Sequence, residues 1–434
     1  MRRPALFLTA ALAAALAAPL AGAQTQSDFG SIYSRFGVGE RLDFSTSQAS
    51  MLGLSGAALR AGLYNGLANP ALGADQTLTT FSLGASVQGL EATDAADGRT
   101  RATSAELTGL QFGVPLYAGR AGVTLSYRPY SRVNYRAVET GSFISPADTA
   151  AFRANYEGEG GLQRASLGLG VRLGRAVQLG ASADALFGRV EYVQRTEFPG
   201  ATDLLETRTT TSTRVAGFTS TLGATVSAER LLASADQFTA GASVTLPARL
   251  TGEAARTIGG GLDRDTLSVT QSGALTLPLI AQGGLSYRAS PRVLIAADML
   301  FEPWSAFRSD FPLAGVDPVT GEAAALRDRL RAGAGAEIIP AGATRTGSLL
   351  RDTAYRFGAY AEQGLYAPAD ARVTTLALTG GLSIPTRFTA TRFDLGLEVG
   401  TRGSTSDVLV RDVFVKGSAT FNFGERWFIR RRLG

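Results

Sequence analysis

The side chains that carry most enzyme chemistry are missing from this sequence. The chain of 434 residues contains no Cys and no His. Without Cys there is no thiolate nucleophile, no disulfide and no cysteine-ligated zinc or iron–sulfur centre. Without His there is no Ser/His/Asp triad, no HExxH metal motif and no histidine general base. Because no pair of carboxylates stands out either, we expect a protein that is not an enzyme and that uses no metal or cofactor.

The chemistry that remains is that of arginine and the carboxylates. Of the 42 basic residues only Lys416 is a lysine, and 37 acidic residues leave a formal net charge of +5. Apart from the run Arg430, Arg431 and Arg432, the arginines are spread singly along the chain. A nucleic-acid partner would need them gathered on one face or stripe. We therefore expect no nucleic-acid partner, and expect the terminal run to meet lipid head groups or solvent.

The N-terminus is typical of an exported bacterial protein. Arg2 and Arg3 precede an apolar stretch, which ends before the small-residue cleavage pattern Ala21-Gly22-Ala23. We expect a signal peptide over residues 1–23 that is removed near Ala23, and a retained signal anchor is the alternative. Beyond it, no segment has the roughly 20 mostly apolar residues of a membrane helix.

Apolar and polar residues alternate along much of the remaining chain. In the segment 392–400, Phe393, Leu395, Leu397 and Val399 share one face of a strand, and the intervening residues are Arg, Asp, Gly and Glu. A soluble β-sandwich would also alternate. However, the runs are about 9 to 11 residues long, which matches a tilted membrane strand, and their polar face is rich in Gly, Ser and Thr. We predict an all-β protein, an outer-membrane antiparallel β-barrel with a polar lumen.

The number of alternating segments is about 14, an even number as bacterial barrels require. They begin near residues 78, 103, 121, 163, 176, 214, 237, 267, 292, 329, 353, 373, 391 and 413. Tight turns near residues 175 and 290 belong on the periplasmic side, and longer connections near residues 97, 143, 203, 263, 316 and 347 belong outside. We expect Trp304 and Trp427 to anchor at the membrane interfaces.

A barrel of this width is not filled by its own side chains. The segment 24–77 precedes the first strand and alternates poorly, so we predict that it forms a hatch inside the lumen, with the barrel over residues 78–434. Within it we expect a short helix around residues 51–59, which is ended by a turn at Asn69-Pro70. A soluble periplasmic lobe is the alternative for this segment.

Several stretches resemble FadL-type outer-membrane transporters of long-chain fatty acids and other hydrophobic compounds. They are AGLYNGLANPAL at 61–72, Leu277-Pro278 leading into a strand, and ADMLFEPWSAF at 297–307. The opening YSRFGVGE at 33–40 and the tail at 400–432 look like a branch of their own within that family. The resemblance implies a 14-stranded barrel whose hatch contains Asn69, Pro70 and Ala71. It also implies passive passage of hydrophobic molecules, often sideways through a gap in the wall.

A hydrophobic ligand needs an apolar pocket with a few polar groups that fix its orientation. The candidates for the apolar lining come from the hatch and from inward positions of strands: Phe36, Leu63, Tyr64, Leu67, Leu294, Leu300 and Phe414. Ordinary packing between hatch and wall is the alternative for each of them.

Arg288 and Arg356 are the candidates to meet a carboxylate of the ligand. The alternative for each luminal arginine is a structural ion pair. The acidic partners expected for such a pair are Asp298, Glu302, Glu362, Asp394 and Glu398.

These observations predict an outer-membrane channel for passive uptake of hydrophobic small molecules such as long-chain fatty acids, embedded in outer-membrane lipid. Two alternatives stay open. One is a scaffold or shuttle barrel of a secretion or surface-attachment machine, with an envelope protein as its partner. The other is a porin for polar solutes.

Overall fold

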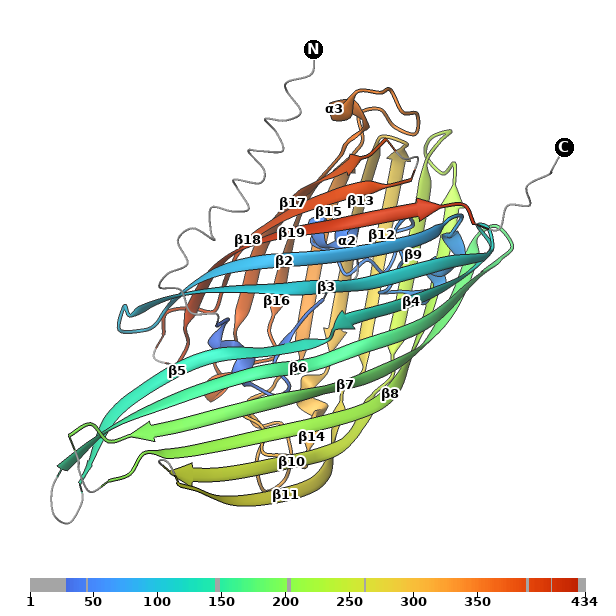
Figure 1. Ribbon diagram of the computed structural model, residues 1–434. Coiled ribbons are helices and arrows are strands. Elements are labelled where there is room, and N and C mark those ends of the chain that lie inside the picture. Colours follow the sequence, from blue (N-terminus) through green and yellow to red (C-terminus); the bar gives the residue numbers. More distant parts are fainter. Residues whose placement is uncertain are drawn as a thin grey trace.

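The computed structural model describes residues 29–43, 46–144, 149–200, 204–260, 263–387, 390–406 and 408–427. The predicted signal peptide at 1–23 and the run Arg430 to Arg432 lie outside these ranges. Antiparallel strands make up most of the described chain (Figure 1). Within these ranges, no helix has the length and apolar character needed to cross a membrane.

The strands form one closed ring. Its members are β2 (Thr79–Thr93), β3 (Arg99–Tyr117), β4 (Ala121–Pro129), β5 (Ser131–Ile144), β6 (Thr149–Leu173), β7 (Val177–Glu197), β8 (Thr207–Glu229), β9 (Gln237–Thr245), β10 (Ala248–Gly260), β11 (Asp263–Leu277), β12 (Ile280–Ser290), β13 (Val293–Glu302), β15 (Arg329–Ile338), β16 (Ala354–Gln363), β17 (Thr374–Pro385), β18 (Arg392–Arg402) and β19 (Arg411–Glu425). The last strand, β19, pairs with the first, β2, from Arg411 opposite Thr93 to Glu425 opposite Thr79. This pairing closes the ring.

Three strands of the wall are interrupted, and in two of them both halves pair with the same neighbour. β4 and β5 both pair with β6 on either side of Tyr130, and β9 and β10 both pair with β8 on either side of Leu246-Pro247. The third break, at Pro278 between β11 and β12, also falls at a proline, which has no N–H to donate to the ladder. When each interrupted pair counts as one strand, the described ring has 14 strands, as predicted.

One side of the wall extends far beyond the other. β6, β7 and β8 are 25, 21 and 23 residues long, whereas β15 and β16 have 10 residues each. The extension, which β5, β10 and β11 continue, occupies the lower left of Figure 1. Its strands are polar on the outer face, for example at Arg136 and Glu157, which lie opposite each other. These extended strand segments have no apolar face that the sequence pattern could reveal. The predicted start of β6, near residue 163, is therefore 14 residues after its actual start at Thr149.

The predicted division into two faces is confirmed by burial. The outward side chains of the ring are apolar and exposed, among them Phe357, Leu378, Leu397 and Ile295. In β18 the alternate residue Asp394 is fully buried inside the ring. A closed ring with an apolar outer belt is the architecture that crosses an outer membrane, because closure of the ring leaves no free sheet edge at its ends.

One connection lies at the opposite end from the prediction. β13 ends at Glu302 opposite Arg329, and its first residue, Val293, lies opposite Ile338. The segment 339–353, with α3 (Leu349–Asp352), is therefore at the same end as the tight turn at residues 291–292. The prediction that this connection lies outside is wrong, because loop length alone does not reveal the direction of the preceding strand.

The described part of the predicted hatch, residues 29–43 and 46–77, lies inside the ring. It contains η2 (Ile32–Arg35), β1 (Glu40–Arg41), α2 (Ser47–Met51) and η3 (Pro70–Asp75); we call it the interior segment. Glycines on the inner face let its backbone approach the wall: a Cβ at Gly358 would lie 2.1 Å from the Leu52 carbonyl oxygen. The predicted helix at 51–59 is wrong in position. The helix begins after Thr46, which caps it, and stops at Leu52 before Gly53 at a φ of +72°.

The apolar outer belt predicts where an added charge should prevent assembly of the barrel. Leu397→Arg places a charge in the belt at a cost of about 2 to 4 kcal/mol near the bilayer midplane, so assembly should fail. Val319→Arg, at an equally apolar residue that is 91% exposed in the loop before β15, should assemble normally. The heat-modifiable gel shift of the folded barrel measures both. Equal shifts for the two variants would contradict the assignment of the belt.

Candidate functional site

Asn69 fastens the interior segment to the wall. Its Nδ2 donates to the carbonyl oxygens of Ala57 at 2.9 Å, Ala224 at 3.0 Å and Ala242 at 3.2 Å. Its Oδ1 accepts from the Ala71 N–H at 3.1 Å and so caps η3. Ala224 belongs to β8 and Ala242 to β9, so one buried amide joins a turn of the interior segment to two wall strands.

Pro70 and Ala71 are buried against the same part of the wall. A Cβ at Gly180 in β7 would lie 2.3 Å from the Ala71 nitrogen, and a Cβ at Gly223 in β8 would lie 2.0 Å from Asn69 Oδ1. These glycines are required where the backbone of η3 touches the strands. The Asn-Pro-Ala motif is thus an anchor that depends on matching glycines in the wall.

A network of buried ion pairs crosses the lumen nearer the loop end of the ring. Arg329 of β15 contacts Glu302 at 3.2 Å and Glu362 at 2.7 Å, and it also pairs with Asp43 of the interior segment. Arg41 lies 3.1 Å from the same Glu302. Since the side chains of Glu302 and Arg329 are 0% and 1% exposed, each charge needs its partner, and removing one would leave a buried charge uncompensated.

Glu40 of β1 holds a second group of charges. Arg402 lies 2.5 Å from it and Arg132 lies 3.4 Å from it, and Arg132 also contacts Glu106 at 3.0 Å. Burial alone would raise the pKa of Glu40, but the two guanidinium groups outweigh burial and lower this pKa to about 2. The interior segment is therefore held to the wall by a carboxylate that stays ionised at neutral pH.

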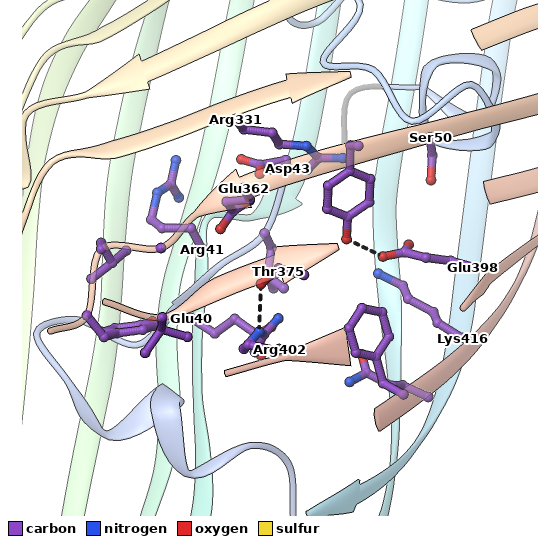
Figure 2. A pocket seen from close by; sticks show the side chains of 18 residues that line it. Glu40, Arg41, Asp43, Ser50, Arg331, Glu362, Thr375, Glu398, Arg402 and Lys416 are labelled. Carbon is purple, nitrogen blue, oxygen red and sulfur yellow. Dashed lines mark hydrogen bonds and ion pairs between the residues drawn. The ribbon is translucent and has the colours of Figure 1, made fainter. Parts of the chain in front are cut away.

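Between these groups lies a small polar chamber of about 80 Å³ (Figure 2). Four basic and four acidic side chains line it: Arg41, Arg331, Arg402, Lys416, Glu40, Asp43, Glu362 and Glu398. Its size is that of a few water molecules. The chamber is too small and too polar to hold an extended hydrophobic ligand.

The predicted apolar lining residues lie in different parts of the barrel. Leu294 packs with Ala49 and Leu52, Leu300 belongs to the large cluster around Trp304, and Phe414 belongs to a third cluster. Phe36 lies 5.5 Å from the Tyr366 ring. Leu63, Tyr64 and Leu67 are half-buried near the turn end of the ring. The structure does not bring these residues together in one apolar pocket, and their contact with a ligand stays a prediction.

The two predicted arginines share one carboxylate. Arg356 is buried, lies 2.8 Å from Glu337 and 3.4 Å from Asp394, and donates to the Tyr64 hydroxyl at 2.9 Å. Arg288 lies 4.0 Å from the same Glu337, and 28% of its side chain is exposed. The expected pair with Asp394 is present, but Glu337 was missed. It lies directly opposite Arg356, and only the register between β15 and β16 reveals that.

Trp304 does not lie at a membrane interface, so that prediction is wrong. Its side chain is fully buried, its Nε1 donates to Glu302 at 2.5 Å, and its ring lies 5.4 Å from Phe307. Pro303 ends β13 just before it, and the chain then turns inward over the lumen. Trp427, by contrast, is half exposed on the outside.

The wall has a gap that sequence reasoning did not place. β3 pairs with β4 between Leu110 and Tyr117, but in the described chain no backbone pairing joins the rest of β3 to β5. The edge of β5 pairs instead with β1, where Glu40 lies opposite Arg132. The interior segment thus lies along the open edge of the wall.

A cavity of about 320 Å³ lies at this gap; we call it the lateral window. From the outer belt it is lined by Leu107, Leu110 and Tyr127, and from the interior by Leu42 and Arg132. Its lining is mostly apolar. It connects the membrane-facing surface with the interior segment.

Two sequence signals could have located the lateral window. They are Gly109, with a φ of +134°, and the pair Gly160-Gly161, with φ values of +104° and +139°. Such glycines mark bulges and bends in a strand.

A family model described as BamG matches residues 8–434 of the chain. No curated protein matches the chain. Several solved structures do match the chain. The toluene transporter TbuX of Ralstonia pickettii is 18% identical, with a TM-score of 0.55 over 88% of this chain and 98% of that one. A Pseudomonas aeruginosa FadL homologue is 12% identical, with a TM-score of 0.59 over 91% of this chain and 100% of that one.

The Pseudomonas putida toluene transporter TodX is 14% identical, with a TM-score of 0.56 over 89% of this chain and 99% of that one. At these identities the likeness concerns the fold. The expected FadL-type barrel is confirmed at that level.

Loss of the Asn69 anchor should loosen the interior segment. Asn69→Ala leaves three carbonyl groups without their donor, and we expect a loss of about 1 to 3 kcal/mol of stability. Gly223→Ala should act from the other side, because its Cβ would displace the Asn69 side chain. Gln237→Ala, at the exposed end of β9, is the control. The temperature at which the folded gel band is lost measures the effect; no difference among the three variants would count against the anchor.

The lowered pKa of Glu40 predicts how acid acts on the interior segment. Because this pKa is about 2 in the folded protein against an ordinary value of 4.5, its stabilising contribution is complete above about pH 4.5 and is lost as the pH falls toward 2. The unfolding temperature of the wild type should therefore fall across that interval. Glu40→Gln should be less stable at pH 7 and should show a shallower fall. An identical pH profile for both proteins would refute the role of this carboxylate.

Proposed function

Because the chain belongs to the BamG family and folds as a closed barrel like the solved channels, we propose that it is a passive outer-membrane channel for hydrophobic small molecules. The proposal is of a non-enzymatic protein, surrounded by outer-membrane lipid. Hydrophobic compounds enter or leave through the lateral window and not along an open pore.

The lateral window is the observation that carries this proposal. An apolar molecule dissolved in the bilayer meets Leu107 and Leu110 at the belt and Leu42 behind them. The two charged residues of the lining, Glu106 and Arg132, form an ion pair with each other at 3.0 Å. A cavity of about 320 Å³ lies within the range of small-molecule sites. Its size suits an aromatic compound or a stretch of acyl chain. Long-chain fatty acids are one class of cargo that this geometry accommodates.

The packed lumen determines what else the proposal requires. The polar chamber holds about 80 Å³, and a second luminal cavity, beside Arg164 and Glu302, holds about 30 Å³. Passage along the ring axis therefore requires the interior segment to shift. The same packing argues against a porin for polar solutes, which needs a permanently open aqueous path.

The packed lumen also favours a second candidate function. A barrel whose interior is fastened by buried ion pairs and by Asn69 is a rigid body that suits a scaffold subunit of an envelope machine. In that case a protein partner would be retained on purification from the native membrane, and solute uptake would not depend on the barrel.

Filling the lateral window should slow entry of hydrophobic compounds. Leu107→Trp and Gln163→Trp place large side chains at residues that line it. We expect several-fold slower uptake of a labelled long-chain fatty acid and of labelled toluene. Leu167→Trp, at an exposed outward residue of β6 that does not line the lateral window, is the control. Entry of a small polar sugar, measured in the same cells, tests the porin alternative.

The outcomes of these uptake experiments distinguish the channel, the porin and the scaffold. Uptake that depends on the protein and is slowed only by the two window variants supports the channel. Hydrophobic uptake that is the same with and without the protein, while sugar entry depends on it, would replace the channel by a porin. If uptake of neither solute depends on the protein, and a protein partner is retained on purification, the result would favour the scaffold.

A further inference from the structure

Every connection at the turn end of the ring contains an exposed arginine. The connections are residues 118–120, 174–176, 230–236, 291–292, 339–353 and 386–391. Their exposed arginines are Arg120, Arg175, Arg230, Arg292, Arg351 and Arg387. Arg426, directly after β19, is exposed at the same end, where the arrow of β19 ends in the upper right of Figure 1. We call these seven residues the arginine rim.

The two ends of the ring have opposite net charges. With Arg345, the six connections at the turn end contain seven arginines and two acidic residues, a net charge of +5. The connections at the loop end are residues 94–98, 145–148, 198–206, 261–262, 303–328, 364–373 and 403–410. They contain three arginines and eleven acidic residues, a net charge of −8. Since short turns face the periplasm in barrels of this kind, the positive end is the periplasmic one.

The carboxylates of the turn-end connections do not neutralise the arginine rim. Asp236 is buried and accepts from the N–H groups of residues 231–233 at 2.7 to 3.0 Å. Asp352 is buried and accepts from the N–H groups of residues 346 and 347 at 2.8 and 3.0 Å. Ion pairs at this end involve other arginines, such as Arg60 with Asp75. Within the described ranges, no arginine of the rim forms an ion pair.

Two exposed carboxylates lie in the strands beside the arginine rim. They are Glu229 and Glu425, the last residues of β8 and β19. Glu229 accepts from Gln237 at 3.4 Å, and Glu425 accepts from the Trp427 Nε1 at 3.3 Å. These two charges reduce the positive excess at the turn end but do not cancel it.

The arginine rim borders the apolar outer belt. Leu116 and Tyr117, at the end of β3, are each 62% exposed, and the Arg120 guanidinium lies 5.5 Å from the centre of the Tyr117 ring. Beside Arg426, the Trp427 ring lies 6.0 Å from the Phe112 ring of β3. Aromatic residues at the edge of the belt mark the interface between membrane and water. The rim therefore lies at the level of the lipid head groups.

We propose that the arginine rim binds the phosphate groups of anionic glycerophospholipids in the periplasmic leaflet of the outer membrane. A guanidinium donates charge-assisted hydrogen bonds to a phosphate, while the belt beside it contacts the acyl chains of the same lipid. This continuity with the belt favours a lipid over a soluble acidic protein. The inference goes beyond the proposed function, and it holds for a channel, a porin or a scaffold alike.

Trp427 is a reporter for lipid at the arginine rim. The chain has two tryptophans, and Trp304 is fully buried inside the ring, so a lipid with brominated acyl chains should quench Trp427 selectively. The full mature chain is reconstituted in vesicles that contain brominated phosphatidylglycerol or brominated phosphatidylcholine. Both lipids have a phosphate, but the choline of the second cancels its charge. We expect phosphatidylglycerol to bind beside Trp427 about fivefold more tightly, the effect of roughly one arginine near an anionic surface.

The variant that tests the rim removes the three arginines around Trp427. β19 lies between β18 and β2, so the turns with Arg387 and Arg120 are on either side of it. The triple variant Arg120→Gln, Arg387→Gln, Arg426→Gln should lose the preference for phosphatidylglycerol. The same three changes to Lys should retain most of it, because the charge is kept.

A matched control removes three exposed arginines of the loop end. It is Arg99→Gln, Arg195→Gln, Arg308→Gln, at residues that pair with Glu91, Glu206 and Glu322, and it should keep the wild-type preference. The heat-modifiable gel shift confirms that each variant is folded.

Three results would overturn the proposal. They are equal affinity of the wild type for both lipids, an unchanged preference in the Gln variant of the rim, and an equal loss in the loop-end control. A soluble protein that is retained through the rim arginines, with no preference between the lipids, would replace the lipid by a protein partner.

Discussion

The width of the ring is the constraint on which the rest of this structure depends. Fourteen strands enclose more space than their own inward side chains fill, so a lumen that excludes a continuous water channel needs further chain to fill it. The interior segment meets this need. Its backbone approaches the wall at glycines such as Gly358 and Gly180, where any side chain would collide with it. The abundance of glycine on the inner faces therefore follows from the need to accommodate a second layer of chain inside the barrel.

Because chain fills the lumen, charged side chains there lie away from water. Their ion-pair partners are distributed differently at the loop end and at the turn end of the ring. Near the loop end, Arg329 and Glu302 are fully buried and each has an opposite charge within 3.2 Å. Such pairs hold the interior segment, because removing one partner leaves a buried charge. At the turn end the balance is different. Arg392 is bound by carbonyl and hydroxyl oxygens, and positive charge remains beside an open cavity. The first region attaches the interior segment to the wall.

The two cavities that open to the surroundings of the barrel differ in their chemistry. The lateral window joins the outer belt to Leu42 through a mostly apolar lining, whereas arginines such as Arg288 and Arg392 line the cavity at the turn end of the ring. The ion-paired chamber is too small for an extended hydrophobic molecule, so any passage along the ring axis depends on movement of the interior segment.

The sequence by itself determined the ring and the two faces of its strands, because a period of two with an apolar face is a local property of each segment. It likewise excluded histidine and cysteine chemistry, and Asn69-Pro70 was identifiable as a turn. The partners of individual side chains were decided only by the tertiary structure. That Glu337 lies opposite Arg356 depends on strand register, and that Trp304 lies in the lumen depends on a turn at Pro303. The lateral window arises because β5 pairs with β1 of the interior segment and not with β3. These contacts join residues far apart in the chain, and local periodicity contains no information about them.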